Sequence, residues 1–249
     1  MPDPTLDPTE PARPAPASSA KSREAVVDAL MRLAAIQPWE DIELVDIARE
    51  AGISLSDMRD LYPSKGAILD GFTRMIDKRV IDGTTEDLAG EPARERLFDV
   101  IMRRLDAMAP YRVALRRISL ALRQDPMSML ALNRSALNSS RYMLAAAGIP
   151  SEGPLGFVKL QGTVIALANV MEAWFEDDDP SQARTLARLD RELGRGERVL
   201  ERADDIRRLT APLRAIGQAL MDGRERMRRR TGAGTTASDG ETKDPAAAI

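Results

Sequence analysis

Apolar residues recur every three or four positions along most of the chain, which is the spacing that places side chains on one face of an α-helix. The first apolar stripe, over 26–33, predicts a helix that starts near Ser22. Two short helices are predicted next, over 44–51 and about 54–62, with a turn at Gly52 between them. No alternating run of apolar and polar residues indicates a β-strand. The pattern therefore predicts an all-α fold.

Serine, aspartate and proline residues mark the expected helix ends. Ser54 and Ser64 each precede an apolar stripe and are suitable N-caps, because a serine hydroxyl can accept from an unpaired amide of the first turn. Pro110 divides two amphipathic segments. Asp178 and Asp179 precede Pro180, which is typical of an N-cap followed by the first helical position. The further helices predicted after Ser64 run over 97–108, 113–122, 127–147, 155–175 and 180–209, with a basic segment over 212–230.

Both ends of the chain lack a periodic apolar pattern. The first twenty residues contain six of the sixteen prolines, and residues 231–249 are rich in Gly, Thr, Ala and Asp. Such segments cannot bury enough apolar surface to fold, so disordered tails are expected over 1–20 and 231–249. Between the tails we expect a small helical domain over 21–80 and a larger helical domain over 81–230.

The composition excludes most catalytic chemistry. The 249 residues include neither cysteine nor histidine, which removes thiolate nucleophiles, imidazole bases and the usual zinc ligands. We therefore expect a protein that is not an enzyme and that needs no cofactor or metal. The acidic run 176–179 is interpreted as a helix cap, because the spacing of a calcium loop is absent. The sequence contains no secretory signal and no uncharged apolar stretch of membrane-spanning length, so a cytoplasmic protein is expected.

The segment 46–65 carries the most specific signal in the sequence. Two short helices joined by a glycine turn are typical of a helix-turn-helix. The string DIAREAGIS at 46–54, followed by LYPSK at 61–65, resembles the DNA-binding domain of TetR/AcrR-family regulators in both residues and spacing. This resemblance covers about residues 22–80. It implies a TetR-like fold in which 21–80 form the DNA-binding domain and 81–230 form the ligand-binding and dimerisation domain.

The resemblance also implies which residues meet double-stranded DNA. The helix over about 54–62 is expected to enter the major groove, with positions 54–57 nearest the base edges. The side chains expected to contact DNA are Lys21, Arg23, Ser54, Leu55, Ser56, Asp57, Arg59, Tyr62 and Lys65. However, the segment 40–65 contains seven acidic and three basic residues, which opposes attraction to phosphates. A TetR-shaped domain that no longer binds DNA well is therefore the alternative at this point.

A regulator of this kind is expected to bind a palindromic operator as a homodimer and to respond to a small apolar effector. We expect the helices over 155–175 and 180–209 to form the dimer interface. The residues expected to line the effector pocket are Tyr142, Met143, Phe157, Met171 and Trp174. Methionine-rich walls adapt to irregular apolar ligands, although the same residues at helical spacing are also typical of an ordinary core.

A second, looser resemblance gives an alternative function. The segments 96–111 and 172–191 are similar to the lipid-binding accessory proteins of ubiquinone biosynthesis, which share the TetR-like fold and have a degenerate helix-turn-helix. This resemblance implies that the cavity holds an isoprenoid. The segment 206–230 contains eight arginines and two acidic residues, and a basic amphipathic helix there would contact a membrane surface.

Overall fold

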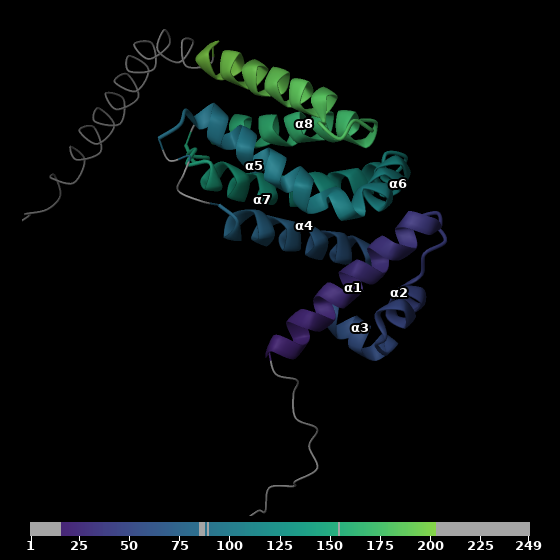
Figure 1. Cartoon of the computed structure of the whole chain (residues 1–249). Coiled ribbons are helices and arrows are strands. Elements are labelled where there is room, and N and C mark those ends of the chain that lie inside the picture. The colour runs from purple at the N-terminus through teal and green to yellow at the C-terminus, as the bar shows by residue number, and fades with distance from the viewer. Residues whose placement is uncertain (1–15, 85–87, 89, 154, 203–249) are drawn as a thin grey trace, which may run out of the picture. The chain divides into compact units, whose positions relative to one another are not determined.

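The computed structural model describes residues 16–84, 88, 90–153 and 155–202. Over these ranges the chain is helical and has no β-strand, so the predicted all-α fold is confirmed (Figure 1). No helix in this part of the chain has the length and apolar character needed to cross a membrane. The elements are α1 (Pro16–Ile36), α2 (Leu44–Ala51), α3 (Leu55–Leu61), α4 (Lys65–Asp82), α5 (Ala93–Met108), the 3-10 turn η2 (Ala109–Tyr111), α6 (Arg112–Leu122), α7 (Pro126–Ala146), α8 (Gly156–Phe175) and a helix over 183–202.

The predicted caps of the short helices are confirmed. The Ser54 hydroxyl accepts from the Asp57 amide at 3.0 Å, and the Ser64 hydroxyl accepts from the Ala67 amide at 3.2 Å. Gly52 follows α2 with φ 70°, in the left-handed region that glycine adopts at the lowest cost. The turn between α2 and α3 is therefore specified by residues that lie within it.

The predicted start of the first helix is wrong. Helix α1 begins at Pro16 rather than near Ser22, so residues 16–20 of the expected disordered tail are helical. Proline suits the first turn of a helix, because the amide that it lacks would have no partner inside the helix. Residues 1–15 and 203–249 lie outside the described residues, and so do the predicted C-terminal tail and the basic segment 206–230.

The predicted start of the last described helix at Pro180 is also wrong, because this helix begins at residue 183. Pro180 lies in a turn, in which the Gln182 amide donates to the Asp179 carbonyl at 2.9 Å. Gln182 has φ 51° and ends this turn. The carboxylate that binds the first turn of the helix belongs to Asp177, which accepts from the Thr185 amide at 2.8 Å. The interpretation of the acidic run 176–179 as a helix cap is confirmed, but the capping carboxylate is that of Asp177 and not one directly before a helix start at Pro180.

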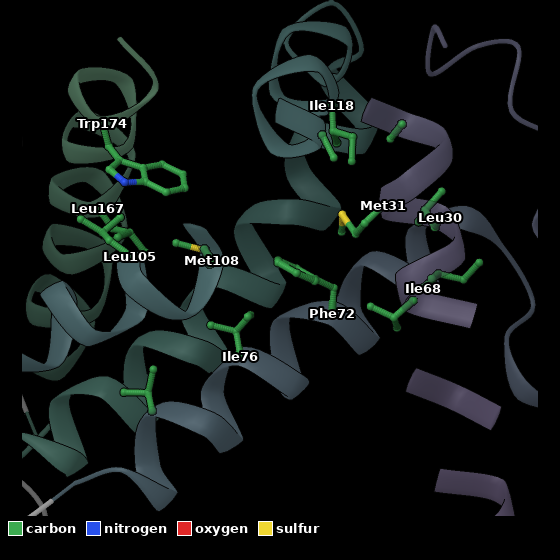
Figure 2. Packing of buried hydrophobic residues seen from close by; sticks show 14 of the residues in the cluster. Leu30, Met31, Ile68, Phe72, Ile76, Leu105, Met108, Ile118, Leu167 and Trp174 are labelled. Atoms are coloured by element: carbon green, nitrogen blue, oxygen red, sulfur yellow. The ribbon is translucent and has the colours of Figure 1, made fainter. Parts of the chain in front are cut away.

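A single cluster of buried apolar side chains joins the first helices to the later ones. Leu30 of α1, Ile76 of α4 and Leu105 of α5 belong to this cluster and are fully buried. Figure 2 shows them together with Trp174 of α8. Helix α4 packs against α1, α5 and α7, and its last residues pass the domain boundary predicted at residue 80. The division into domains over 21–80 and 81–230 stays a prediction.

A buried ion pair further ties α4 to the later helices. Asp77 of α4 accepts from the Arg104 guanidinium of α5 and from the Ser139 hydroxyl of α7, the latter at 2.6 Å. The two charged residues are 8% and 5% exposed. Because a buried charge without its partner is costly, the pair favours one arrangement of these three helices. The orientation of α4 relative to α5 and α7 is therefore well specified.

Candidate nucleic-acid interface

Helices α2 and α3 form a helix-turn-helix that packs on α1 (Figure 1). Ile47 of α2 and Met58 of α3 are buried in this contact. Successive residues of an α-helix are separated by about 100° around its axis, so the residues on either side of Met58 turn away from the core. Ser56, Arg59 and Asp60 are exposed there. Helix α3 therefore presents a short polar face to solvent.

Ser54 and Asp57, at the start of α3, bind each other. The Ser54 hydroxyl donates to Asp57 Oδ2 at 2.7 Å while it accepts from the Asp57 amide. A base edge would have to compete with these bonds for both side chains. In contrast, Arg59 and Asp60 make no hydrogen bond or ion pair with any described residue. Leu55 is 53% exposed beside them and offers an apolar surface.

Lys65, at the start of α4, is held against the loop that precedes α2. Its Nζ donates to the Trp39 carbonyl at 2.7 Å and lies 4.6 Å from the centre of the Trp39 ring. Burial lowers the pKa of Lys65, and the charges of Glu40 and Glu43 oppose this shift. An ammonium group has three donors, so Lys65 keeps donors for a second partner such as a phosphate.

Tyr62, predicted to contact DNA, is placed in the core and is only 4% exposed. Its ring packs on Gly71 of α4 so closely that a Cβ atom at this glycine would lie 2.5 Å from the Tyr62 hydroxyl. Burial raises the pKa of Tyr62, and the charges of Arg74 and Arg23 oppose the shift. Such a side chain has almost no surface to offer to DNA. Lys21 and Arg23, in contrast, are exposed on α1.

Two ion pairs offset part of the acidity of the helix-turn-helix. Arg32 Nε of α1 lies 2.6 Å from Glu50 Oε1, and Arg49 lies 3.0 Å from Asp46. Neither pair is among the contacts predicted from the sequence. The spacing of three residues between Asp46 and Arg49 is a local helical signal that could have shown the second pair. Arg32 and Glu50 are 18 residues apart and meet only through the packing of α2 on α1.

The five residues predicted to line an effector pocket differ widely in exposure. Met143 and Trp174 are core residues at 2% exposure, whereas Tyr142 and Phe157 are 57% and 68% exposed. Met171 is half-buried against the core. The space beside Tyr142 and Met143 is too narrow to admit a water molecule. An effector pocket at these residues stays a prediction.

Comparisons with known proteins agree with this geometry. No family model matches the chain. The HTH-type transcriptional regulator AlkX of Mycobacterium tuberculosis is 31% identical over 87 residues, which are 35% of this chain and 41% of that relative. Less than half of the relative's length is therefore matched.

Two solved structures give the structural side of the comparison. A TetR transcriptional regulator from Nitrosomonas europaea is 23% identical, with a TM-score of 0.57, and covers 70% of this chain and 97% of its own. A TetR regulator from Rhodococcus sp. RHA1 is 16% identical, with a TM-score of 0.47, over 72% of this chain and 97% of its own. The first similarity shows that the fold is TetR-like. The predicted resemblance to TetR/AcrR-family regulators is thereby confirmed.

Proposed function

We propose that the chain is a TetR-like transcriptional regulator that binds operator DNA through α1, α2 and α3. The observation that carries this proposal is the exposed polar face of α3. The Gly52 turn and the Ser54 cap set the start of this helix, and its opposite face packs on α1. The names of the relatives, AlkX and the regulator from N. europaea, support it. The protein acts by binding and not by catalysis.

In this proposal α3 enters the major groove of the operator. Arg59, exposed and without a partner among the described residues, neutralises a phosphate. Leu55 packs on a thymine methyl group, which is the apolar feature of that groove. Ser56 contacts a base edge, while Lys21, Arg23 and the spare donors of Lys65 hold the flanking backbone. Tyr62 takes no part because it is buried.

The proposal includes a homodimer that is formed through α8. Phe157 and Ile165 are 68% and 54% exposed, and their spacing of eight residues puts them on one helix face with Ala168, which is also exposed. An apolar stripe of this kind is suited to a two-fold contact with a second copy. Two DNA-binding units (α1–α3) that are related by this two-fold axis fit half-sites about 34 Å apart on a palindromic operator.

An effector then acts by shifting a population of dimers. A small apolar molecule that binds more tightly to dimers with one separation of the two DNA-binding units (α1–α3) increases the population of those dimers. Operator affinity falls when that separation does not match the two half-sites. Because the space beside Tyr142 and Met143 admits no water-sized molecule, binding of an effector there requires α4 and α7 to move apart.

Fluorescence anisotropy of the full chain with the DNA upstream of its own reading frame tests DNA binding. The logarithm of the affinity is expected to fall linearly with the logarithm of salt concentration, with a slope of about −0.9 for each phosphate neutralised. Arg59→Ala should weaken binding roughly tenfold and make the slope shallower by about one. Arg134→Ala, an exposed arginine of α7, is the matched control. Absence of binding at low salt, or equal affinities for both variants, would remove the proposal.

One observation favours the lipid-binding alternative as a second candidate function. Helix α7 begins with an uncharged apolar segment in which Met127 and Leu130 are 73% and 59% exposed. Exposed apolar patches mark contact sites for proteins or lipids. Native mass spectrometry of the purified chain would show a co-purified isoprenoid or phospholipid in this case. Flotation with liposomes, with and without residues 206–230, tests the predicted membrane contact.

A further inference from the structure

A cleft of about 340 Å³ lies where α1 meets η2 and α6. Its size falls in the range of small-molecule sites, which begins at about 300 Å³. Its walls include Asp28, Met31 and Ala35 from α1, and Tyr111 and Val113 from the other side. None of the five residues of the predicted effector pocket lines it.

Asp28 contributes a carboxylate to this cleft. Arg32 also lines it, but its guanidinium is bound to Glu50, at 2.6 Å from the side chain and 3.5 Å from the carbonyl oxygen. The charge of Arg32 is therefore compensated outside the cleft. Asp28 Oδ1 accepts from the Tyr111 hydroxyl at 3.0 Å, and the Asp28 carboxylate makes no ion pair within the described residues. The Tyr111 hydroxyl also accepts from Arg79 Nη1 at 3.5 Å, so this guanidinium meets Asp28 only through the hydroxyl. Asp28 Oδ2 makes no hydrogen bond within the described residues.

The other walls of the cleft are apolar. Met31 is 2% exposed and belongs to the core cluster, in which Figure 2 shows it beside the buried residues of α4 and α6. Val113 is 61% exposed at the opposite wall, and Ala35 adds a small side chain that leaves the space open. A half-buried carboxylate among apolar walls is complementary to a cation that carries an apolar group.

We propose that the cleft between α1 and α6 binds small apolar molecules that carry a protonated amine. The ammonium group donates to Asp28 Oδ2, and the apolar part packs between Met31, Ala35 and Val113. The ammonium group supplies the hydrogen-bond partner that Asp28 Oδ2 lacks. Binding to this site does not depend on whether the chain binds DNA.

A consequence for regulation follows and rests on the proposed function. Helix α1 carries the helix-turn-helix and packs directly on α6, which also contacts α7 and α8. A ligand that contacts both α1 and α6 stabilises the arrangement of these two helices that the structure shows. The size of this effect depends on how much more tightly the ligand binds this arrangement than any other. Operator affinity then changes with the concentration of the amine.

Isothermal titration of the full chain with benzylamine tests the site, with benzyl alcohol and benzoate as probes of similar size without the positive charge. Benzylamine is expected to bind at least tenfold more tightly than either. Asp28→Asn should weaken benzylamine binding tenfold or more, because it keeps an acceptor for Tyr111 and removes only the charge. Glu152→Gln, which changes an exposed acid in the loop between α7 and α8, should have no effect.

A second variant guards against a change of fold. Ala35→Leu fills the cleft, leaves Asp28 in place, and should abolish benzylamine binding while the circular dichroism spectrum stays unchanged. No benzylamine binding to the unaltered chain, or equal binding to Asp28→Asn, overturns the proposal. The titrations contain no DNA, so their failure is separate from a failure of operator binding. Adding benzylamine to the anisotropy assay then measures the coupling, which should be lost in Asp28→Asn.

Discussion

Single side chains of α3 set the balance between attraction to DNA and repulsion from it. Asp60 is adjacent to Arg59, is exposed, and has no partner among the described residues. Its charge repels phosphates, although a carboxylate can also accept from cytosine N4. We expect Asp60→Asn to tighten binding to DNA of random sequence by roughly threefold to tenfold at low salt. Anisotropy measures this change, with the exposed Asp106→Asn of α5 as control. Weaker binding to random DNA would contradict the expectation.

Gly71 matters because of its close contact with Tyr62. An added Cβ atom would lie between 2.5 and 2.9 Å from atoms of the tyrosine ring. Gly71→Ala should therefore lower the free energy of unfolding by about 1–3 kcal/mol, as overpacking of a core does. At Gly66 in the same helix, the nearest atom to an added Cβ is Ser64 Oγ at 3.7 Å. Gly66→Ala should be neutral or stabilise by up to about 1 kcal/mol. Thermal melts compare the two, and equal melting temperatures would refute the proposed contact.

At the scale of elements, local signals explain which helix ends could be predicted. The caps at Gly52, Ser54 and Ser64 depend on hydrogen bonds within four residues, so the sequence alone identifies them. The start of the last described helix could not be predicted in the same way. Several aspartates precede it and give the same signal, and the turn at Gln182 decides that Asp177 is the one that reaches the helix.

The Asp177 cap leads to a prediction about pH. Asp177 accepts from the Thr185 hydroxyl at 2.7 Å and from its amide at 2.8 Å, and these bonds lower the pKa of Asp177 below its ordinary 3.8. The carboxylate therefore stabilises the fold above its unfolded pKa, and this contribution is lost as the pH falls through the lower folded pKa. Asp177→Asn should lower the melting temperature at pH 6, with a difference that shrinks below pH 4. The exposed Asp178→Asn should show no such dependence. A constant difference across the pH range would exclude the cap as its cause.

At the scale of the molecule, the sequence predicted the fold but not which distant side chains meet. The helical periods and the segment 46–65 were enough for an all-α, TetR-like fold, because each depends on neighbours in the chain. Asp77 and Arg104 are 27 residues apart, and Tyr111 and Asp28 are 83 apart. Such pairs form only when helices pack. Residue type alone predicts the pocket residues and does not determine their burial, because packing places Met143 inside and Phe157 outside.

The proposed dimer gives a test at this scale. Ile165 is 54% exposed at the middle of the apolar stripe of α8, and two-fold symmetry would bring it to the interface twice. Ile165→Asp then buries two uncompensated charges in each dimer, which costs several kcal/mol and raises the dissociation constant by about a hundredfold or more. Light scattering after size exclusion should show a mass near 27.3 kDa for this variant and twice that value for the unaltered chain.

Ile36→Asp, at an exposed position at the end of α1, controls for the added charge and should leave the dimer intact. A dimer that survives Ile165→Asp would place the interface on another surface, and a chain that is monomeric without any change would remove the dimer from the proposal. DNA binding links the two measurements. Because a monomer engages one half-site at a time, Ile165→Asp should lose most of its affinity for a palindrome. Its affinity for a single half-site should equal that of the unaltered chain.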